Sequence, residues 1–543
     1  MLKSFYQCTL SFIVCAFGLV YINGFLALLA ACFGYGLFFS YVRAFSTKKK
    51  FWIATSWFFC VQLVHLFWLT NPTYCGLVIW FGYLFYASIL AIPFGLAVLL
   101  IPKQLNRSDL VLLPLAFVLV EAVRSLYFYG LPWSSFNLHL SFTFPMQLAS
   151  YFGAYFLTYL VFLNNFLFLF AIEKKSNNRW INFAFVAILP FLFGFAHIKA
   201  FENFKTNKGL DVVLIQPMLS TAEPLFGGVP KNLNQVETPY QNIQHFVGVL
   251  PEKTDVLLFP EGSFLTSLHS FAYRLDEIKA LLEPLSENIA QFFPKLEAPY
   301  GVHVQENVYV NNAFILQTFA NFYDADVICS IDDRVSLYDT KWANCAIFFQ
   351  KDKPYERYLK QKLVPITEYI PFEWTRKIAS FWGINMECIP GKHSSVFLGK
   401  ANYGTSICYE KGFSSIQRAF RNGGANLFVN LSNEMWFPNT TLAKEDLIFA
   451  KYRAIENGIT FLNVCNSSQT AVIDRFGRVQ NQIDPLLENN KTPKILESFV
   501  ALEMHPTLYT KIGDVPLLTL SILSLIITCV QRLWQHRRKE KRA

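Results

Sequence analysis

Long apolar stretches separated by short polar loops fill the first part of the chain. Because a helix needs about 20 apolar residues to cross a lipid bilayer, this pattern predicts membrane-spanning helices. The first stretch is short and follows Lys3, which is also typical of a cleaved signal peptide, but the spans after it favour an uncleaved helix. The candidate spans cover residues 8–22, 24–42, 51–69, 77–101, 109–128, 145–171 and 180–197, with an eighth at 515–531.

A different pattern begins near Lys205 and continues to about residue 500. Apolar residues at near-helical spacing predict helices over 270–293 and 442–457. Strands that alternate with helices are typical of a layered α/β domain, and a block of roughly 300 residues can bury its own core. Short apolar runs predict the strands at 211–215, 255–259, 307–310, 325–329, 343–349, 403–408 and 426–430.

The predicted organisation therefore has a membrane part and a polar part. A seven-helix membrane domain is expected over 1–198, an α/β domain over 207–500, a final transmembrane helix over 513–531 and a basic tail over 532–543. Hydrophobic residues make up 53% of the chain, which includes 56 Phe. The mean hydropathy is +0.30. These values exclude an ordinary soluble multidomain protein.

Basic residues are concentrated in alternate loops between the predicted spans. Such residues tend to stay on the cytoplasmic side of a membrane, so both termini are expected in the cytoplasm and residues 199–512 outside it. The tail after residue 532 is expected to contact anionic lipid rather than nucleic acid, and the net charge of +9 then implies no acidic partner. The basic loop residues are Arg43, Lys48, Lys49, Lys50, Lys103, Arg107, Lys174, Lys175 and Arg179.

Cysteine usage adds a constraint on the polar part. An odd number of cysteines in an oxidising compartment leaves at least one thiol unpaired, and the pairing of the others stays open. No CxxC pair or Cys/His cluster has the spacing of a zinc site, so no metal is expected. Five of the 11 cysteines lie in this part: Cys329, Cys345, Cys388, Cys408 and Cys465.

Three polar residues form a candidate catalytic set. Cys408 ends one predicted strand, Glu261 follows another, and Lys360 lies in the stretch between them. A cysteine attacks an acyl group as its thiolate, which requires a base for the proton and a cation for the developing negative charge. Strand ends in an open sheet bring distant residues together. Without the other two, Cys408 would be interpreted as a small buried residue, Glu261 as a turn residue and Lys360 as a solvated charge.

The order of three motifs resembles that of the carbon-nitrogen hydrolase (nitrilase) superfamily. They are Phe-Pro-Glu-Gly at 259–262, Tyr-x-Lys-x-x-Leu-Val-Pro-x-x-Glu-x-x-Pro at 358–371 and Ile-Cys-Tyr-Glu at 407–410. Together with the predicted membrane-spanning helices on either side, these motifs make nearly the whole chain resemble the apolipoprotein N-acyltransferase family. Further similar segments are Ile215-Gln216-Pro217, 431–437, 452–456 and 470–474 with Gly477.

The resemblance implies an αββα sandwich outside the membrane and a role for each matching residue. Cys408 would be the nucleophile, Glu261 its general base and Lys360 the cation beside the tetrahedral oxyanion. Glu368, Tyr409 and Glu410 would support these three, with pairing or packing as the alternative for each. The chain departs from the family pattern at Thr367, Asp446 and Lys451, which puts fine substrate positioning in doubt.

A Cys/His pair is the usual rival mechanism for a cysteine enzyme. The polar part has five histidines, and no one of them lies in a recognisable catalytic setting, so they are interpreted as structural or surface residues. They are His245, His269, His303, His393 and His505.

Further residues are candidates for lipid binding. Trp374, Phe381 and Trp382 recur at helical spacing beside Arg376 and Lys377, which favours an amphipathic segment in the membrane interface over a buried helix. Trp436 is a weaker candidate for the same rim. Glu121 and Arg124 lie three residues apart in one span, where they either pair with each other or contact a phospholipid headgroup.

The resemblance implies a phospholipid acyl donor and a diacylglyceryl-modified apolipoprotein acceptor at the bacterial inner membrane. Acyl transfer would pass through a Cys408 thioester, with no metal, ATP or organic cofactor, because the ester already carries the activation. A membrane-anchored amidase that releases a free acid is the first alternative. A transporter or scaffold without turnover is the second, and the intact set of three residues weighs against it.

Overall fold

The computed structural model describes most of the chain. The described residues are 2–71, 79–126, 130–173, 177–218, 239–334, 341–365, 368–370, 372–373, 376–377, 380, 388–438, 440–483 and 493–540. The described residues divide into two compact units, one of those within Met1–Asn71, Leu77–Asn203 and Pro506–Ala543, and the other of those within Phe204–His505. Each unit has its own core and is described separately.

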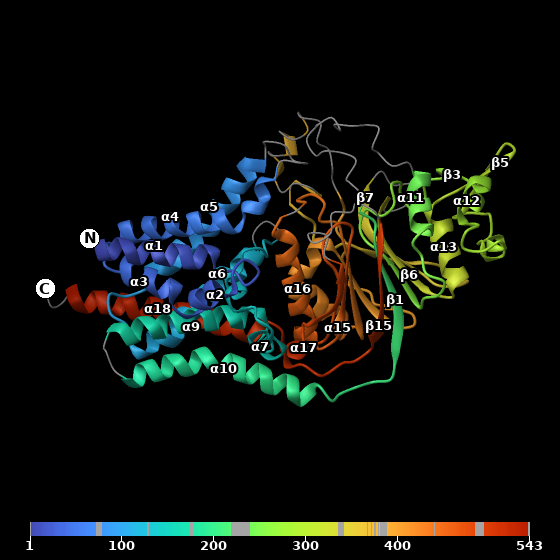
Figure 1. Ribbon diagram of the computed structural model, residues 1–543. Coiled ribbons are helices and arrows are strands. Elements are labelled where there is room, and N and C mark those ends of the chain that lie inside the picture. Colours follow the sequence, from blue (N-terminus) through green and yellow to red (C-terminus); the bar gives the residue numbers. More distant parts are fainter. Residues whose placement is uncertain are drawn as a thin grey trace. The chain divides into compact units, whose positions relative to one another are not determined.

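The first unit is a helical bundle, drawn from blue to teal in Figure 1 with the red helix α18. Its long helices are α1 (Leu2–Phe17), α4 (Thr47–His65), α5 (Ile79–Leu99), α6 (Arg107–Leu126), α9 (Ala154–Glu173), α10 (Asn177–Phe201) and α18 (Val515–Glu540). Between α1 and α4, the helices α2 (Gly24–Leu29) and α3 (Tyr35–Val42) are joined through a π-helical turn at Ala30–Gly34.

Five described helices are long and apolar enough to cross a membrane. They are Gly24–Val42, Ile79–Leu99, Ala154–Glu173, Asn177–Phe201 and Val515–Trp534. The other predicted spans overlap with α1, α4 and α6 but are displaced toward the C-terminus by two to six residues. The predicted span 8–22 is wrong at its end, because α1 ends at Phe17, and α4 and α6 carry charged residues. The predicted span at 145–171 is wrong at its start, because the short helices α7 (Thr143–Met146) and α8 (Ala149–Phe152) end at Gly153 before α9 begins. Gly153 has a φ of 76°, which favours glycine and turns the chain.

Stacked aromatic rings fill the core of this bundle. The ring centroids of Phe38 and Trp57 lie 4.1 Å apart, and those of Phe117 and Phe162 lie 3.9 Å apart. In lipid these rings stabilise the bundle through dispersion contacts of about 0.1–0.2 kcal/mol for each pair of atoms. The last helix joins the same bundle, because Ser524 on α18 donates a hydrogen bond to the Leu112 carbonyl of α6 at 2.7 Å.

The second unit contains two six-stranded sheets. The first has the strand order β15-β1-β2-β6-β7-β8 and the second β14-β13-β12-β11-β10-β9. The bounds in the first sheet are β1 (Gly209–Gln216), β2 (Val256–Phe259), β6 (Asp326–Arg334), β7 (Trp342–Phe349), β8 (Glu356–Leu359) and β15 (Lys494–Ala501). Those in the second are β9 (Phe397–Leu398), β10 (Asn402–Ile407), β11 (Leu427–Ser432), β12 (Phe461–Cys465), β13 (Thr470–Ile473) and β14 (Val479–Ile483).

The central strands of both sheets run parallel: β1 pairs with β2 and β2 with β6, while β10 pairs with β11 and β11 with β12. The two sheets face each other, with β7 against β10 and β1 against β12. Helices α11 (Pro239–Val247) and α13 (Asn312–Tyr323) cover the first sheet, and α15 (Ser414–Asn422) and α16 (Leu442–Asn457) cover the second (Figure 1). The layers therefore form an αββα sandwich, and the carboxyl ends of the parallel strands are available for a site.

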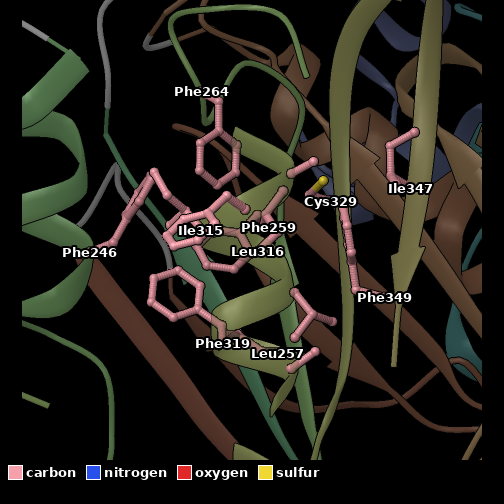
Figure 2. Packing of buried hydrophobic residues seen from close by; sticks show 14 of the residues in the cluster. Phe246, Leu257, Phe259, Phe264, Ile315, Leu316, Phe319, Cys329, Ile347 and Phe349 are labelled. Carbon is pink, nitrogen blue, oxygen red and sulfur yellow. The ribbon is translucent and has the colours of Figure 1, made fainter. Parts of the chain in front are cut away.

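Alternation along the strands decides which side chains meet the helices. Leu257, Phe259, Cys329, Ile347 and Phe349 point from the first sheet toward α13, as Figure 2 shows. Successive residues of a strand point to opposite faces. Ser330, Asp332 and Asn344 therefore lie on the other face, which looks toward the second sheet.

Most predicted strands coincide with observed ones, and the predicted helix at 442–457 coincides with α16. The predicted helix at 270–293 is only partly right. Tyr273–Arg274 instead form β3, which pairs with β5 (Asn307–Val310), and α12 covers only Leu275–Leu282. Pro284 lacks the backbone N–H that a longer helix requires, so α12 ends before it.

Candidate active site

Cys408 lies at a sharp change in backbone direction. The strand β10 ends at Ile407, one residue earlier than predicted, and Cys408 opens a 3₁₀ turn over Cys408–Gly412. Its φ is 49°, a left-handed conformation that costs energy for a residue with a side chain. Asn430 on the neighbouring strand β11 donates a hydrogen bond to the Cys408 carbonyl at 3.3 Å. Surrounding contacts thus hold a strained backbone at the residue predicted to be the nucleophile.

Lys360 lies directly after β8 and is nearly fully buried. Its backbone N–H donates to the Asn344 carbonyl at 2.9 Å, and its own carbonyl accepts from Gly391 at 2.8 Å. Its Nζ lies 2.6 Å from Oε1 of Glu368 and 3.5 Å from Oε1 of Glu261. The structure therefore brings Glu261 beside Lys360 and Glu368, from which it is widely separated in the sequence.

Glu261 follows β2 and reaches this cluster from the other side. Its Oε1 accepts a hydrogen bond from the Asn344 side chain, and its Oε2 accepts from the Asn433 backbone N–H at 3.1 Å. The next residue, Gly262, has a φ of 77°, and a Cβ there would lie 2.8 Å from Asn433 Nδ2. Glycine thus permits the turn that directs Glu261 into the site.

Glu368 and Glu410 are both held by backbone N–H groups. Oε2 of Glu368 accepts from Val364 at 2.7 Å. The buried carboxylate of Glu410 accepts from the Gln361 N–H at 2.6 Å and from the Ile407 N–H at 2.9 Å. Glu410 therefore ties the segment after Lys360 to the end of the strand before Cys408. This contact fixes the two candidate catalytic residues relative to each other.

The electrostatics of the thiol are balanced between opposing groups. Burial raises the pKa of Cys408 above its usual range, Glu261 raises it further, and Lys360 and Lys411 oppose that shift. Burial by itself would lower the pKa of Lys360, but Glu261 and Glu368 raise that pKa well above its ordinary value. At neutral pH the resting site thus holds a thiol and an ammonium, and the thiol needs a base at the moment of attack.

A second buried lysine near Cys408 is absent from the sequence prediction. Nζ of Lys411 lies 2.6 Å from Oε1 of Glu434 and 3.5 Å from Oδ2 of Asp446. Burial by itself would lower the pKa of Lys411, but Glu434 and Asp446 raise it well above its ordinary value. Asp446 is one of the departures from the family pattern, and here it pairs with a cation.

Asn344 and Asn433 are also absent from the prediction, although both bind Glu261 directly. Asn344 lies inside the predicted strand 343–349, where a polar residue on a buried face was the available signal. Asn433 follows β11 and presents its backbone, which a sequence pattern does not reveal.

The remaining predicted residues lie apart from these contacts or beyond the described residues. Tyr409 is buried with its ring 4.9 Å from that of Phe413, which gives it a packing contact beside Cys408. Trp436 is half-buried in the turn after β11. Trp374, Phe381 and Trp382 lie outside the described residues.

Glu121 and Arg124 form a buried ion pair within the first unit. Arg124 Nη1 lies 3.5 Å from Glu121 Oε1, and it also donates to the Ser134 carbonyl at 2.9 Å. Oε2 of Glu121 accepts from the Phe136 N–H at 2.9 Å. The pair holds the loop around Pro132 in place, and its contact with a phospholipid headgroup stays a prediction.

The described cysteines of the second unit are free thiols. Cys329, Cys345 and Cys465 are buried, whereas Cys388 and Cys408 are half-buried. Cys408 is thus one of two partly accessible thiols in the described part of this unit, and it is the one held at a strained turn beside Glu261 and Lys360.

Comparison with known proteins places this site in a class. Residues 243–489 match the model of the carbon-nitrogen hydrolase family, so the αββα unit is a carbon-nitrogen hydrolase domain. Residues 11–167 match the model of the apolipoprotein N-acyltransferase N-terminal domain.

Relatives extend the similarity over both units. The apolipoprotein N-acyltransferase of Chlamydia trachomatis serovar D is 27% identical over 525 residues, which cover 90% of this chain and 89% of that protein. The enzyme of the same name from Chlamydia caviae is 25% identical over 547 residues, which cover 95% of each chain. The chain belongs to the apolipoprotein N-acyltransferase family, and it is an N-acyltransferase of a bacterial membrane.

Proposed function

We propose that the protein transfers a fatty acyl chain from a phospholipid to the α-amino group of an N-terminal diacylglyceryl-cysteine on apolipoproteins. The observation that carries this proposal is the single cluster of Cys408, Glu261 and Lys360 in a chain with apolar helices. The family membership supports the lipoprotein acceptor, because the relatives carry that name. A phospholipid is the acyl ester that a membrane supplies.

The first half-reaction forms a thioester. Glu261 accepts the Cys408 proton while the sulfur attacks the ester carbonyl, so the thiol with its raised pKa needs no prior ionisation. Lys360 stabilises the oxyanion that develops, since its ammonium is fixed before the reaction by Glu368. The C–O bond then breaks, Glu261 returns the proton to the departing oxygen, and a lysophospholipid leaves.

The second half-reaction releases the acyl chain as an amide. The neutral amine attacks the thioester carbonyl, the C–N bond forms and the C–S bond breaks. The proton that the amine loses passes through Glu261 to the Cys408 sulfur, which restores the resting thiol. Water is the competing nucleophile, and its exclusion separates a transferase from a hydrolase.

The orientation in the membrane follows from the basic loops. Eight spans, with both termini in the cytoplasm, would place the catalytic unit on the periplasmic side of the inner membrane. Single cysteines introduced into the loops of a variant whose native cysteines are replaced by serine test this topology, because only a cysteine outside the membrane reacts with an impermeant thiol reagent.

A membrane-anchored amidase is the second candidate function, favoured by the carbon-nitrogen hydrolase domain alone. The two are distinguished by offering a diacylglyceryl-cysteine peptide with a free amine and the same peptide with an acetylated amine. The acyltransferase converts only the free amine to an amide. Release of free fatty acid without any amide would establish the amidase, and equal use of both peptides would defeat N-acylation.

A further inference from the structure

The acceptor amine reaches the site with a proton that it must lose. An α-amino group has a pKa of about 7.7–8.0, so most of it is ammonium at neutral pH, and an ammonium cannot attack a thioester. In the proposed mechanism, Glu261 exchanges protons with the thiol and the leaving groups. The first proton of the ammonium requires another acceptor.

Asp332 is a carboxylate that this mechanism does not use. It lies on β6 directly opposite Asn344 on β7, and Asn344 donates hydrogen bonds to Glu261 and to Glu368. By strand alternation, Asp332 shares the face of Ser330 and Asn344, which looks toward the second sheet. Its neighbour Asp333 lies on the opposite face, where it binds His269 at 3.0 Å.

Exposure distinguishes Asp332 from the other residues of this face. Ser330 is 0% exposed and Asn344 is 4% exposed. Asp332 is exposed, so this face opens to solvent at its position. Among the residues that the structure describes, Asp332 has no hydrogen-bond or ion-pair partner, whereas Glu261 and Glu368 share Lys360. A free carboxylate thus lies at the solvent end of the candidate active site.

The charge of this region favours the binding of a cationic ligand. Glu261, Glu368 and Asp332 carry three carboxylates, and Lys360 supplies one cation among them. The thiol of Cys388 also faces Asp332 and is neutral, since burial, with Asp332 adding to it, raises the pKa of Cys388 to about 12. An ammonium that enters beside Asp332 would relieve the excess of negative charge.

We propose that Asp332 binds the ammonium group of the acceptor at the mouth of the site and accepts its proton before the amine attacks the thioester. This inference rests on the proposed function and names the residue that selects and activates its second substrate. The transfer is balanced: the ammonium and the Asp332 carboxylate become a neutral amine and a carboxylic acid. Asp332 then returns the proton to solvent.

The acid strength of Asp332 suits this exchange. Desolvation raises the pKa of Asp332 above its ordinary value, although its exposure to water weakens this effect. Glu261 and Glu368 raise this pKa further, and Lys360 opposes the shift. An ordinary aspartate is too weak a base to deprotonate an ammonium efficiently, because its pKa is about 3.9. A base with a pKa close to that of the amine transfers the proton at far lower cost.

The test separates the two half-reactions in the full-length protein. Asp332→Asn removes the charge but keeps the shape, Asp332→Glu restores a carboxylate, and Asp333→Asn is the control on the opposite face. Acyl-enzyme formation is followed by intact mass. Decay of the acyl-enzyme is then followed with the diacylglyceryl-cysteine peptide and with hydroxylamine, which is largely neutral at neutral pH.

Asp332→Asn is expected to form the acyl-enzyme at the rate of the unaltered protein and to transfer it to the peptide at least about tenfold more slowly. Cleavage by hydroxylamine is expected to be unchanged, and Asp332→Glu to recover part of the transfer rate. Wild-type transfer by Asp332→Asn, or equal slowing with both nucleophiles, would overturn the inference while leaving the proposed function intact. An unaltered protein that acylates no peptide defeats both.

Discussion

The Nζ of Lys360 lies 2.6 Å from Oε1 of Glu368. Glu261 is farther from the same ammonium, at 3.5 Å, and it is also bound by Asn344 and by the Asn433 N–H. We therefore propose different tasks for the two carboxylates. Glu368 would neutralise and orient the lysine, and Glu261 would exchange a proton with Cys408.

This division predicts different losses for two matched substitutions. Glu261→Gln removes the general base and should slow acyl-enzyme formation by about 10²- to 10⁴-fold. Glu368→Gln keeps the base and loses part of the orientation of Lys360, so its effect should be smaller. Single-turnover rates of acyl-enzyme formation measure both. Equal losses, or a larger loss in Glu368→Gln, would contradict the assignment.

Removal of the Lys360 charge should change the titration of Cys408. The ammonium opposes the burial that raises the thiol pKa, so Lys360→Met should raise this pKa further. The pH at which an alkylating reagent modifies Cys408 half-maximally should then move upward, and acyl transfer should fall by about 10²- to 10³-fold.

Lys362→Met is the matched control, because Nζ of Lys362 lies 5.4 Å from the centre of the Phe413 ring rather than beside the carboxylates. It should leave the alkylation profile of Cys408 unchanged, as judged by peptide mapping of the modified thiols. An unchanged profile in Lys360→Met would show that the lysine charge does not act on the sulfur.

The Glu410 contacts predict a positioning role without contact with substrate. The carboxylate accepts hydrogen bonds from Tyr358, Gln361, Lys362 and Ile407. In Glu410→Gln an amide NH₂ would face some of these donors, and each buried group left unpaired costs about 1–3 kcal/mol. The melting temperature and the rate of acyl-enzyme formation should both fall. Tyr358→Phe removes one donor only and should have a clearly smaller effect on both quantities.

The buried pair in the membrane unit gives a prediction about stability. Glu121→Gln leaves the Arg124 charge without its carboxylate and should destabilise the protein by about 3–5 kcal/mol. Glu121→Gln combined with Arg124→Met should be less destabilised than the single change, measured by thermal unfolding in detergent. If the single change instead raises the KM for the phospholipid and leaves stability unaltered, the headgroup contact is the better explanation.

The proximity of the candidate catalytic residues could be predicted from the sequence better than the residues that surround them. Glu261 and Cys408 follow strands with clear apolar patterns, and their motifs have a recognisable order, so their proximity could be expected. The structure adds Asn344 and Lys411 to the site. In the sequence alone, Asn344 is indistinguishable from an ordinary strand residue and Lys411 from a solvated charge. Their burial and partners become visible only when the two sheets face each other.

The same limit applies to element boundaries. The helix at 442–457 was predictable because a continuous pattern ends at Gly458, which has a φ of 63° and closes the helix. The prediction of one helix over 270–293 is wrong in part, because the same apolar spacing also fits a short strand, a short helix and a turn around Pro284. Tertiary pairing of Tyr273 and Arg274 with β5 decided between them.

The covalent mechanism can be tested by the intact mass of the purified protein after incubation with phospholipid. We expect the mass to increase by one fatty acyl group, which maps to Cys408, is removed by hydroxylamine and is absent in Cys408→Ala. A protein that stays unmodified while it still transfers acyl chains to an amine would contradict the covalent mechanism.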